Sequence, residues 1–295
     1  MRRQIIVVLL SLFFSLFAVV LPASALERGA LFKVTGSGHS MYLFGTMHVG
    51  LPEFYPLEPR IAQAVANAST LALEVDPQQP PAVMAKAMRD YGMARPGAAL
   101  PPALAARLAP VLAKAGIDVA TLAPLKPWVV AMVLGLNEYA ALGYRADLAV
   151  DSHLAALARA AKVKVIELES IDAQMALFAR LSDAGQLRYL DDTLALIESG
   201  RQREEVREVV DAWRGADQAA LEALAVRVEL DATWAGRFVQ GVLLEGRNGP
   251  LADKLLALLA KQDNAVAAIG VLHLVGKHSV PVLMRLKGVT VERVY

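Results

Sequence analysis

The stretch that decides the fold lies near the start of the chain, where residues 40–75 read SMYLFGTMHVGLPEFYPLEPRIAQAVANASTLALEV. Residues 40–44 are largely apolar, which is typical of a β-strand, and a glycine follows them. Residues 60–68 have helical periodicity, and residues 71–75 form a second short apolar run. A strand, a helix and a strand in this order predict a sheet with helices packed against it.

The rest of the chain extends this pattern. Residues 31–35 and 40–44 predict a hairpin, because a Gly-Ser-Gly-His turn separates them. Further strands are expected at residues 164–169, 265–271 and 289–294, and helices at residues 83–91, 103–115, 128–141, 152–161 and 273–286. We therefore predict an α/β fold with a mixed central sheet and packed helices. No linker divides residues 26–295, so we expect one domain with helical insertions at about 77–150 and 171–262.

The composition excludes several classes of protein. The chain has 295 residues, with 30 basic and 29 acidic side chains and a net charge of +1. A nucleic-acid-binding protein normally carries a basic surplus, so none is expected as a partner. The absence of cysteine excludes disulfide scaffolds, cysteine-ligated metal sites and cysteine nucleophiles. A hydrophobic content of 56% argues against wholesale disorder.

Residues 1–25 have the three parts of a secretory signal peptide. Arg2 and Arg3 form a basic head, residues 5–21 carry no charge, and Ala23 and Ala25 supply an A-x-A cleavage site. We predict cleavage after Ala25 and a periplasmic or secreted protein. The alternative is an uncleaved anchor helix, because 17 uncharged residues reach the lower limit for a membrane span. No later stretch is long enough to span a bilayer, so no stable membrane anchor is expected after cleavage.

Two histidines occur in the same local setting at the ends of apolar strands. His48 and His273 each close a Gly-x-x-His motif, and two other predicted strands end in the carboxylates Glu74 and Glu169. If these strands are parallel neighbours, all four side chains lie at one edge of the sheet, where open α/β sheets bind ligands. Two imidazoles and a carboxylate suit a Zn, Mn, Fe or Co ion with open positions for water. Such an ion generates a hydrolytic nucleophile.

Four blocks of sequence, taken together and in this order, resemble the TraB/GumN family, whose eukaryotic relatives are the Tiki proteins. The blocks are YLFGTMHVG (42–50), LALEVD (71–76), VDSHL through LES (150–170) with Gln174, and LLEGRN (243–248) followed by GVLHLVG (270–276). They span nearly all of the chain after residue 25. The resemblance implies a site built from His48, His273, Glu74 and Arg247. Relatives often have a small residue and a second glycine before the last histidine, where this chain has Val271 and Leu272.

The resemblance also implies an activity. Tiki proteins are metal-dependent peptidases that use Mn or Co, and the wider superfamily is similar to erythromycin esterases and to haem-uptake proteins of the ChaN type. We expect an exported hydrolase, and specifically a peptidase acting on peptide or protein substrates, with a divalent ion (Mn, Co or Zn). The alternatives are a metal-independent hydrolase of the erythromycin-esterase type, a non-catalytic peptide-sequestering binder and a haem-binding protein.

The leading hypothesis assigns a role to each residue. His48 and His273 hold the metal, and Glu74 is a third ligand or the general base. Arg247 stabilises the oxyanion or holds a substrate carboxylate, with a structural salt bridge as the alternative. For Glu169 a structural role is favoured, and the alternative is that it orients one of the histidines.

Four further residues are expected to lie outside the site. Asp151 should cap a helix that begins at Ser152. His153 should be structural, and His39 should be solvated in the hairpin turn. His278 stands too far along the chain from His273 to share one face of a helix with it, so we do not expect it to be a ligand.

Overall fold

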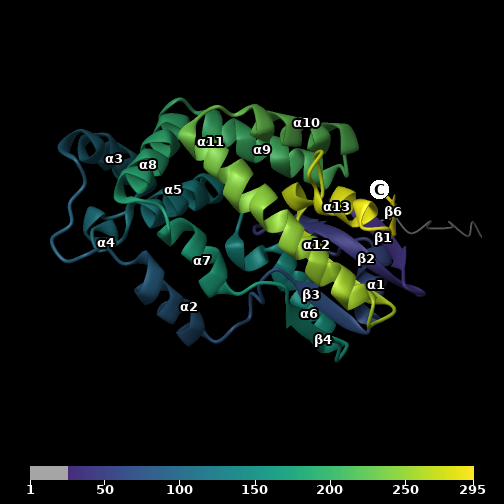
Figure 1. Cartoon of the computed structure of the whole chain (residues 1–295). Coiled ribbons are helices and arrows are strands. Elements are labelled where there is room, and N and C mark those ends of the chain that lie inside the picture. Colours follow the sequence, from purple (N-terminus) through teal and green to yellow (C-terminus); the bar gives the residue numbers. More distant parts are fainter. Residues whose placement is uncertain (1–25) are drawn as a thin grey trace, which may run out of the picture.

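The computed structural model describes residues 26–295, and the predicted signal peptide lies outside the described residues. These residues form a mixed six-stranded sheet with many packed helices, which confirms the predicted fold class (Figure 1). The strands are β1 (Leu31–Gly36), β2 (His39–Thr46), β3 (Thr70–Leu73), β4 (Lys164–Glu167), β5 (Ala265–Gly270) and β6 (Thr290–Arg293).

The strand order is β4-β3-β5-β2-β1-β6. Strands β4, β3, β5 and β2 run parallel to one another, and β1 and β6 complete the sheet with antiparallel pairs. The predicted hairpin joins β1 and β2 through Ser37 and Gly38, which both have a positive φ, as a two-residue type I′ turn requires. Because the four parallel strands share one direction, they all end at the same edge of the sheet.

Thirteen α-helices surround the sheet in the part of the chain that the structure describes. They are α1 (Pro59–Ala66), α2 (Pro81–Ala87), α3 (Pro102–Ala115), α4 (Val119–Leu122), α5 (Pro127–Ala141), α6 (Val150–Ala160), α7 (Ile171–Ala179), α8 (Asp183–Glu198), α9 (Arg201–Arg214), α10 (Gln218–Leu230), α11 (Trp234–Phe238), α12 (Gly246–Leu259) and α13 (Val280–Leu286). Helix α6 contacts β3 and β4, and α12 contacts β2 and β5. Within residues 26–295, none of the helices has the length and apolar character to cross a membrane.

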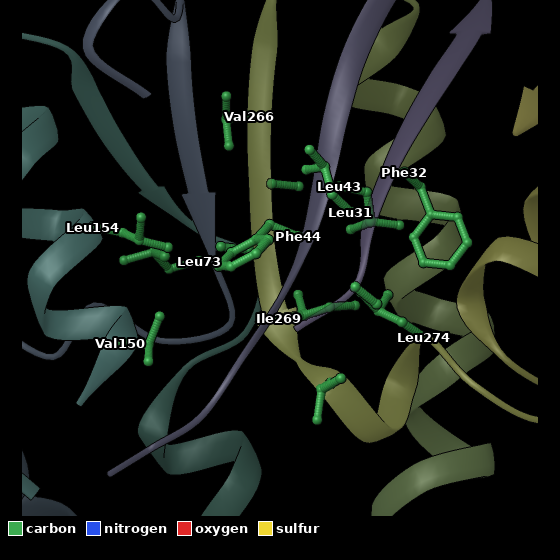
Figure 2. Close-up of a cluster of buried hydrophobic side chains, with 14 of the residues drawn as sticks. Leu31, Phe32, Leu43, Phe44, Leu73, Val150, Leu154, Val266, Ile269 and Leu274 are labelled. Atoms are coloured by element: carbon green, nitrogen blue, oxygen red, sulfur yellow. The ribbon is translucent and has the colours of Figure 1, made fainter. Parts of the chain in front are cut away.

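The main hydrophobic core lies between the sheet and these helices. Strand β5 is buried along residues 265–269, as expected for a parallel strand covered on both faces. In this core, Phe44, Leu73 and Ile269 of the sheet belong to the same buried cluster as Val150 and Leu154 of α6 (Figure 2). This packing fixes the strand ends that carry the candidate site.

The helical region has a second apolar core. Leu108 and Leu112 of α3, Leu134 of α5, and Leu190 and Leu194 of α8 form a buried cluster separate from the main core. In Figure 1 these helices lie together at the end of the molecule away from β1 and β6. The helical region is therefore organised around its own hydrophobic contacts.

The helix expected at residues 273–286 is wrong in its first half. Residues Val271–His273 form a single 3-10 turn, and α13 begins only at Val280. Gly276 has a φ of 85°, which lies outside the right-handed helical region. Pro281 lies in the first turn of α13, where its missing N–H costs no helical hydrogen bond.

Candidate active site

The predicted site residues follow the ends of four neighbouring parallel strands. His48 follows β2, His273 follows β5, Glu74 follows β3 and Glu169 follows β4. These strands are consecutive in the sheet, so their carboxyl ends lie side by side. The structure thus brings together side chains from both ends and the middle of the sequence.

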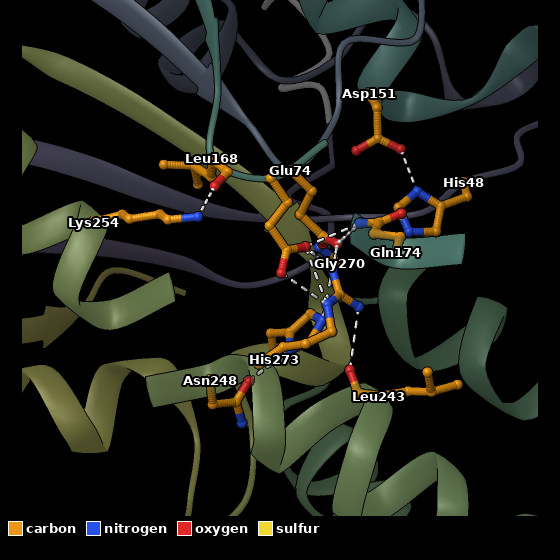
Figure 3. Close-up of polar contacts among 12 residues, drawn as sticks. His48, Glu74, Asp151, Leu168, Gln174, Leu243, Asn248, Lys254, Gly270 and His273 are labelled. Carbon is orange, nitrogen blue, oxygen red and sulfur yellow. Dashed lines mark hydrogen bonds and ion pairs between the residues drawn. The ribbon is translucent and has the colours of Figure 1, made fainter. Parts of the chain in front are cut away.

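Glu74 lies at the centre of the cluster and is 6% exposed. Its Oε1 accepts a hydrogen bond of 2.5 Å from the backbone N–H of Gly270. Its Oε2 accepts from the Arg247 guanidinium and from Gln174 Nε2, the latter at 3.3 Å (Figure 3). Both carboxylate oxygens are therefore already bound by groups of the chain.

Arg247 joins two carboxylates. Its Nε lies 3.1 Å from Glu169 Oε2, and its Nη2 forms ion pairs with both Glu169 and Glu74. The side-chain partners of Glu169 are Arg247 and Gln174, so it does not hold a histidine, which is the less favoured of its two predicted roles. Glu169 instead holds the guanidinium of Arg247 next to Glu74. The planar guanidinium has several N–H donors and can therefore bind two adjacent carboxylates at once.

A π-helical segment positions Arg247. The segment, Val239–Glu245, continues directly from α11 and runs directly into α12, whose second residue is Arg247. The Leu243 carbonyl accepts a hydrogen bond of 3.2 Å from Arg247 Nη1. A π-helical turn displaces side chains from their α-helical directions and occurs frequently at functional sites.

His273 is 3% exposed and has one fixed hydrogen-bond partner. Its Nδ1 lies 2.6 Å from Asn248 Oδ1, and Asn248 Nδ2 donates to the backbone carbonyl of His278 at 2.8 Å. Because only the amide nitrogen can donate to that carbonyl, Asn248 must present its oxygen to His273. Nδ1 of His273 therefore carries the proton, and Nε2, 4.0 Å from Glu74 Oε2, carries the lone pair.

His48 pairs with Asp151 rather than with Glu74. Its Nδ1 lies 2.7 Å from Asp151 Oδ2, which leaves Nε2 free. The prediction that Asp151 caps a helix is wrong: α6 begins at Val150, its N-cap Ala149 has no side-chain cap, and Asp151 lies inside the first turn. Asp151 accordingly points from the buried face of α6 to the histidine.

The Nε2 side of His48 and the His273 ring face the same small volume. A Cβ added to Gly270 would lie 3.3 Å from Glu74 Oε1 and 3.7 Å from both His48 Nε2 and His273 Cδ2. Gly270 ends β5, so the absence of a side chain at this position leaves space between the two imidazoles.

The surroundings set different charges on the three central groups. Burial lowers the pKa of His273 to about 4, so this ring is neutral near pH 7. Burial opposes the ionisation of Glu74, but His273 (charged at low pH), His48, Arg247 and the Gly270 N–H outweigh it and lower its pKa to about 2. Asp151 raises the pKa of His48 to about 9, although water screens part of this attraction at a side chain that is 67% exposed. Near pH 7, Arg247 and His48 are therefore the cations that keep Glu74 ionised.

The other histidines lie outside this cluster. His153 stacks on Tyr55 with 4.1 Å between ring centroids, and His278 pairs with Glu245. His39 is half-buried, and its Nδ1 bonds to the Leu259 carbonyl at 2.8 Å, so the expectation of a solvated ring is wrong.

The donor set offers two imidazole nitrogens to a metal ion. Among residues 26–295, no three His, Asp or Glu side chains are already arranged as a metal site. The two ring nitrogens that no group of the chain engages are His48 Nε2 and His273 Nε2, and an oxygen holds each opposite Nδ1. Because His48 is a cation near pH 7, a metal ion would have to displace the proton on its Nε2. Metal-binding histidines in proteins commonly have this arrangement.

Sequence reasoning missed three residues of the cluster, namely Asp151, Asn248 and Gln174. Asp151 shares the buried face of its helix with Val150 and Leu154, and a carboxylate on an apolar face signals a buried partner. Asn248 directly follows Arg247, but its contact with His273 depends on how α12 meets the loop after β5. No pattern in the sequence gives that geometry.

The fold and the cluster together define an α/β protein with a His/Glu/Arg site at the carboxyl ends of its parallel strands. A family model described as the TraB/PrgY/gumN family matches residues 30–293, and the chain belongs to this family. It is 28% identical over 253 residues to the uncharacterized protein YbaP of Shigella flexneri, which covers 85% of this chain and 89% of that protein. The uncharacterized protein YbaP of Escherichia coli (strain K12) is 27% identical over the same coverage. No solved structure gives a significant match.

Proposed function

We propose that this protein is a hydrolase and that a divalent metal ion binds between His48 and His273. One observation carries the proposal: His48 Nε2 and the His273 ring, through its Cδ2, border the space beside Gly270, while an oxygen atom holds each Nδ1. A structural histidine has no need of this matched arrangement, but a ligand pair does. Mn, Co and Zn all suit two imidazoles with open positions for water.

Each residue then has a chemical task. The metal would supply a Lewis acid that polarises a substrate carbonyl and acidifies water. Glu74 is assigned as the general base rather than as a third ligand. Its Oε2 is held by Arg247 and Gln174, whereas its Oε1 accepts only the Gly270 N–H and keeps a lone pair for a proton. Asp151 and Asn248 orient the two imidazoles.

Arg247 has two tasks in this scheme. It keeps Glu74 ionised, and its guanidinium supports the negative charge that develops on the substrate oxygen. Glu169 and the Leu243 carbonyl hold the guanidinium in position before substrate arrives. Such preorganised charge is commonly a large part of enzymatic catalysis.

We further propose a peptide or protein as the substrate and an exported location. The resemblance to Tiki peptidases supports the substrate class, and the signal-peptide pattern of residues 1–25 supports export.

Metal content is the direct test. The protein beginning at residue 26 should bind about one Mn, Co or Zn ion per chain by calorimetry and elemental analysis. His48→Ala and His273→Ala should each abolish binding, whereas His278→Ala should not, because that ring lies outside the cluster. Retained binding in both site variants would overturn the proposed metal position.

Hydrolysis is tested separately on a peptide library. Glu74→Gln should retain the metal and lose turnover, because the amide cannot accept the proton. Arg247→Lys should also lower kcat, because the single ammonium group of lysine cannot replace a planar guanidinium that contacts two carboxylates. A Glu74→Gln protein with full activity would exclude Glu74 as the base.

A metal-independent hydrolase is the second candidate, and the Asp151–His48 pair favours it. A carboxylate that holds Nδ1 orients Nε2 to act as a general base in the fraction of molecules in which His48 has lost its proton, as in Asp-His pairs of other hydrolases. Activity that persists in a chelator and disappears in His48→Ala would select this candidate. Activity lost in the chelator and restored by Mn, Co or Zn would select the metalloenzyme.

A further inference from the structure

A large open cavity in the helical region takes no part in the proposed hydrolysis. Its volume is about 950 Å³, and its walls are loop residues 93–100, α3, α4 and the start of α8. Leu108, Leu112 and Leu122 of the second apolar core are among its lining residues. Protein interiors are packed densely, and apolar hollows of several hundred Å³ are typical of ligand sites.

The lining is aliphatic. Leucine, valine, methionine, proline and alanine side chains provide most of it, and no aromatic residue lines it in the described part of the chain. The polar side chains in the lining are Arg95, Lys126, Asp183 and Gln186. Gln186, 4% exposed, uses its Nε2 to bond the Leu181 carbonyl at 3.1 Å.

The two cations in the lining have no acidic partner. Arg95 is exposed and Lys126 is half-buried. Within residues 26–295, no hydrogen bond or ion pair engages either side chain, although ion pairs bind other surface cations such as Arg107 and Arg145. With Asp183 as the single carboxylate in the lining, the cavity carries a positive surplus that would complement an anionic group.

We propose that this cavity binds a single-chain anionic amphiphile, a long-chain carboxylate whose acyl tail fills the apolar part and whose head pairs with Arg95 and Lys126. A peptide segment fits less well. Its backbone N–H and C=O groups would need partners along their whole length, but the lining has only four polar side chains, and half of its residues lie in helices, where backbone groups pair with one another. An acyl tail has no polar groups to satisfy, so the aliphatic walls suit it.

The cavity is near the candidate active site but distinct from it. Helix α7 carries Gln174 at the Glu74–Arg247 cluster and ends at Ala179 in the cavity wall. These positions are about 8 Å apart along the helix axis. The proposal concerns binding alone and stands whether or not the cluster hydrolyses anything.

The test measures binding of dodecanoate below its micelle concentration by calorimetry. Wild-type protein should bind one molecule. Ala109→Trp places an indole in the cavity from an exposed position of α3, and should weaken binding about tenfold, which corresponds to roughly two methylene groups left in water. Ala106→Trp is the matched control, because Ala106 is exposed on the same helix and does not line the cavity.

A second variant tests the head group without changing the cavity walls. Arg95→Gln with Lys126→Gln should weaken dodecanoate binding roughly tenfold and leave binding of dodecanol unchanged, because the alcohol carries no charge. The corresponding control is Lys114→Gln, an exposed cation of α3 outside the cavity.

Three outcomes would overturn the proposal. The first is that wild-type protein does not bind dodecanoate. The second is that folded Ala109→Trp binds dodecanoate with the same affinity as wild type. The third is that Arg95→Gln with Lys126→Gln weakens the binding of dodecanoate and of dodecanol equally. Preferential binding of an apolar hexapeptide in place of dodecanoate would assign the cavity to peptides instead. Metal binding at His48 and His273 is measured independently, so failure of one proposal leaves the other distinguishable.

Discussion

Asp151 sets the charge of His48 as well as its orientation. Replacing it with asparagine keeps a hydrogen-bond acceptor and removes the negative charge, so the pKa of His48 should fall from about 9 towards its ordinary 6.5. NMR titration of the imidazoles measures this shift. His153, which stacks on Tyr55, should keep its pKa and serves as the internal control. An unchanged His48 pKa would show that another group stabilises the cation.

Gly270 keeps open the space between the two imidazoles. A Gly270→Ala substitution should cost about 1–2 kcal/mol, because the added methyl group meets Glu74 Oε1 at 3.3 Å and both imidazole rings at 3.7 Å. It should also lower metal affinity. The control is Gly135→Ala in the interior of α5, where the added Cβ has no neighbour within 4 Å and helix propensity favours alanine by about 0.5–1 kcal/mol. Urea unfolding of both variants measures the difference, and equal effects would contradict the crowding argument.

The sequence predicts the reactive residues better than it predicts their partners. His48, Glu74 and His273 could be placed together because each follows an apolar strand, and strand ends converge in a parallel sheet. The contacts of Asp151 and Asn248 could not be predicted in the same way. Their directions depend on where α6 starts and how α12 packs, and both are decided by tertiary contacts.

At the scale of elements, buried strands were easier to predict than helix boundaries. Strand β5 is a continuous run of apolar residues, and such a run has few alternatives inside a domain. Helix starts are less certain, because a cap can be satisfied in several ways. The predicted helix begins at Ser152, two residues after the actual start of α6 at Val150. For this reason alone Asp151 is predicted to be a cap, whereas it lies on the buried face of the helix.

The π-helical segment between α11 and α12 sets the rotation of one helix relative to the other. Deleting Gly241 would favour α-helical pairing and rotate the two helices by about 100° relative to each other. After such a rotation, the contacts of α11 and those of α12 could not both be kept. On α12 these are the contacts of Arg247 and of the buried Leu251 and Leu255. We expect a loss of at least about 2 kcal/mol in urea unfolding, together with loss of metal binding.

Gly241→Ala is the matched control for that deletion. An added Cβ at Gly241 has no neighbour within 4 Å, so the substitution should be tolerated. A deletion variant as stable as Gly241→Ala would show that the π-helical turn has no structural role.

At the scale of the whole molecule, the three shifted groups predict maximal stability near neutral pH for the metal-free protein. His273 has a lowered pKa, so its contribution to the free energy of unfolding is complete above pH 6.5 and is lost as the pH falls through about 4. Glu74 also has a lowered pKa, and its contribution declines from pH 4.5 towards 2. His48 has a raised pKa, so its contribution is present below pH 6.5 and is lost as the pH rises through about 9.

Urea unfolding between pH 4 and pH 9 in a chelator tests this profile. Wild-type stability should decline on both sides of neutrality. Asp151→Asn should have a smaller decline on the alkaline side, because the pKa of His48 is no longer raised. A wild-type stability that keeps rising from pH 7 to pH 9 would contradict the assigned charge of His48.

The position of β5 in the sheet has a consequence for biosynthesis. Strands β2 and β3 do not pair with each other, because β5, near the end of the chain, lies between them. While residues 265–270 of a nascent chain are still inside the ribosome, one edge of β2 and one edge of β3 are therefore unpaired. His48 and Glu74 then lack the strand that brings them together. The cluster cannot be completed until residues 265–273 have been made. Any activity of this protein is thus withheld from its unfinished chains by topology alone.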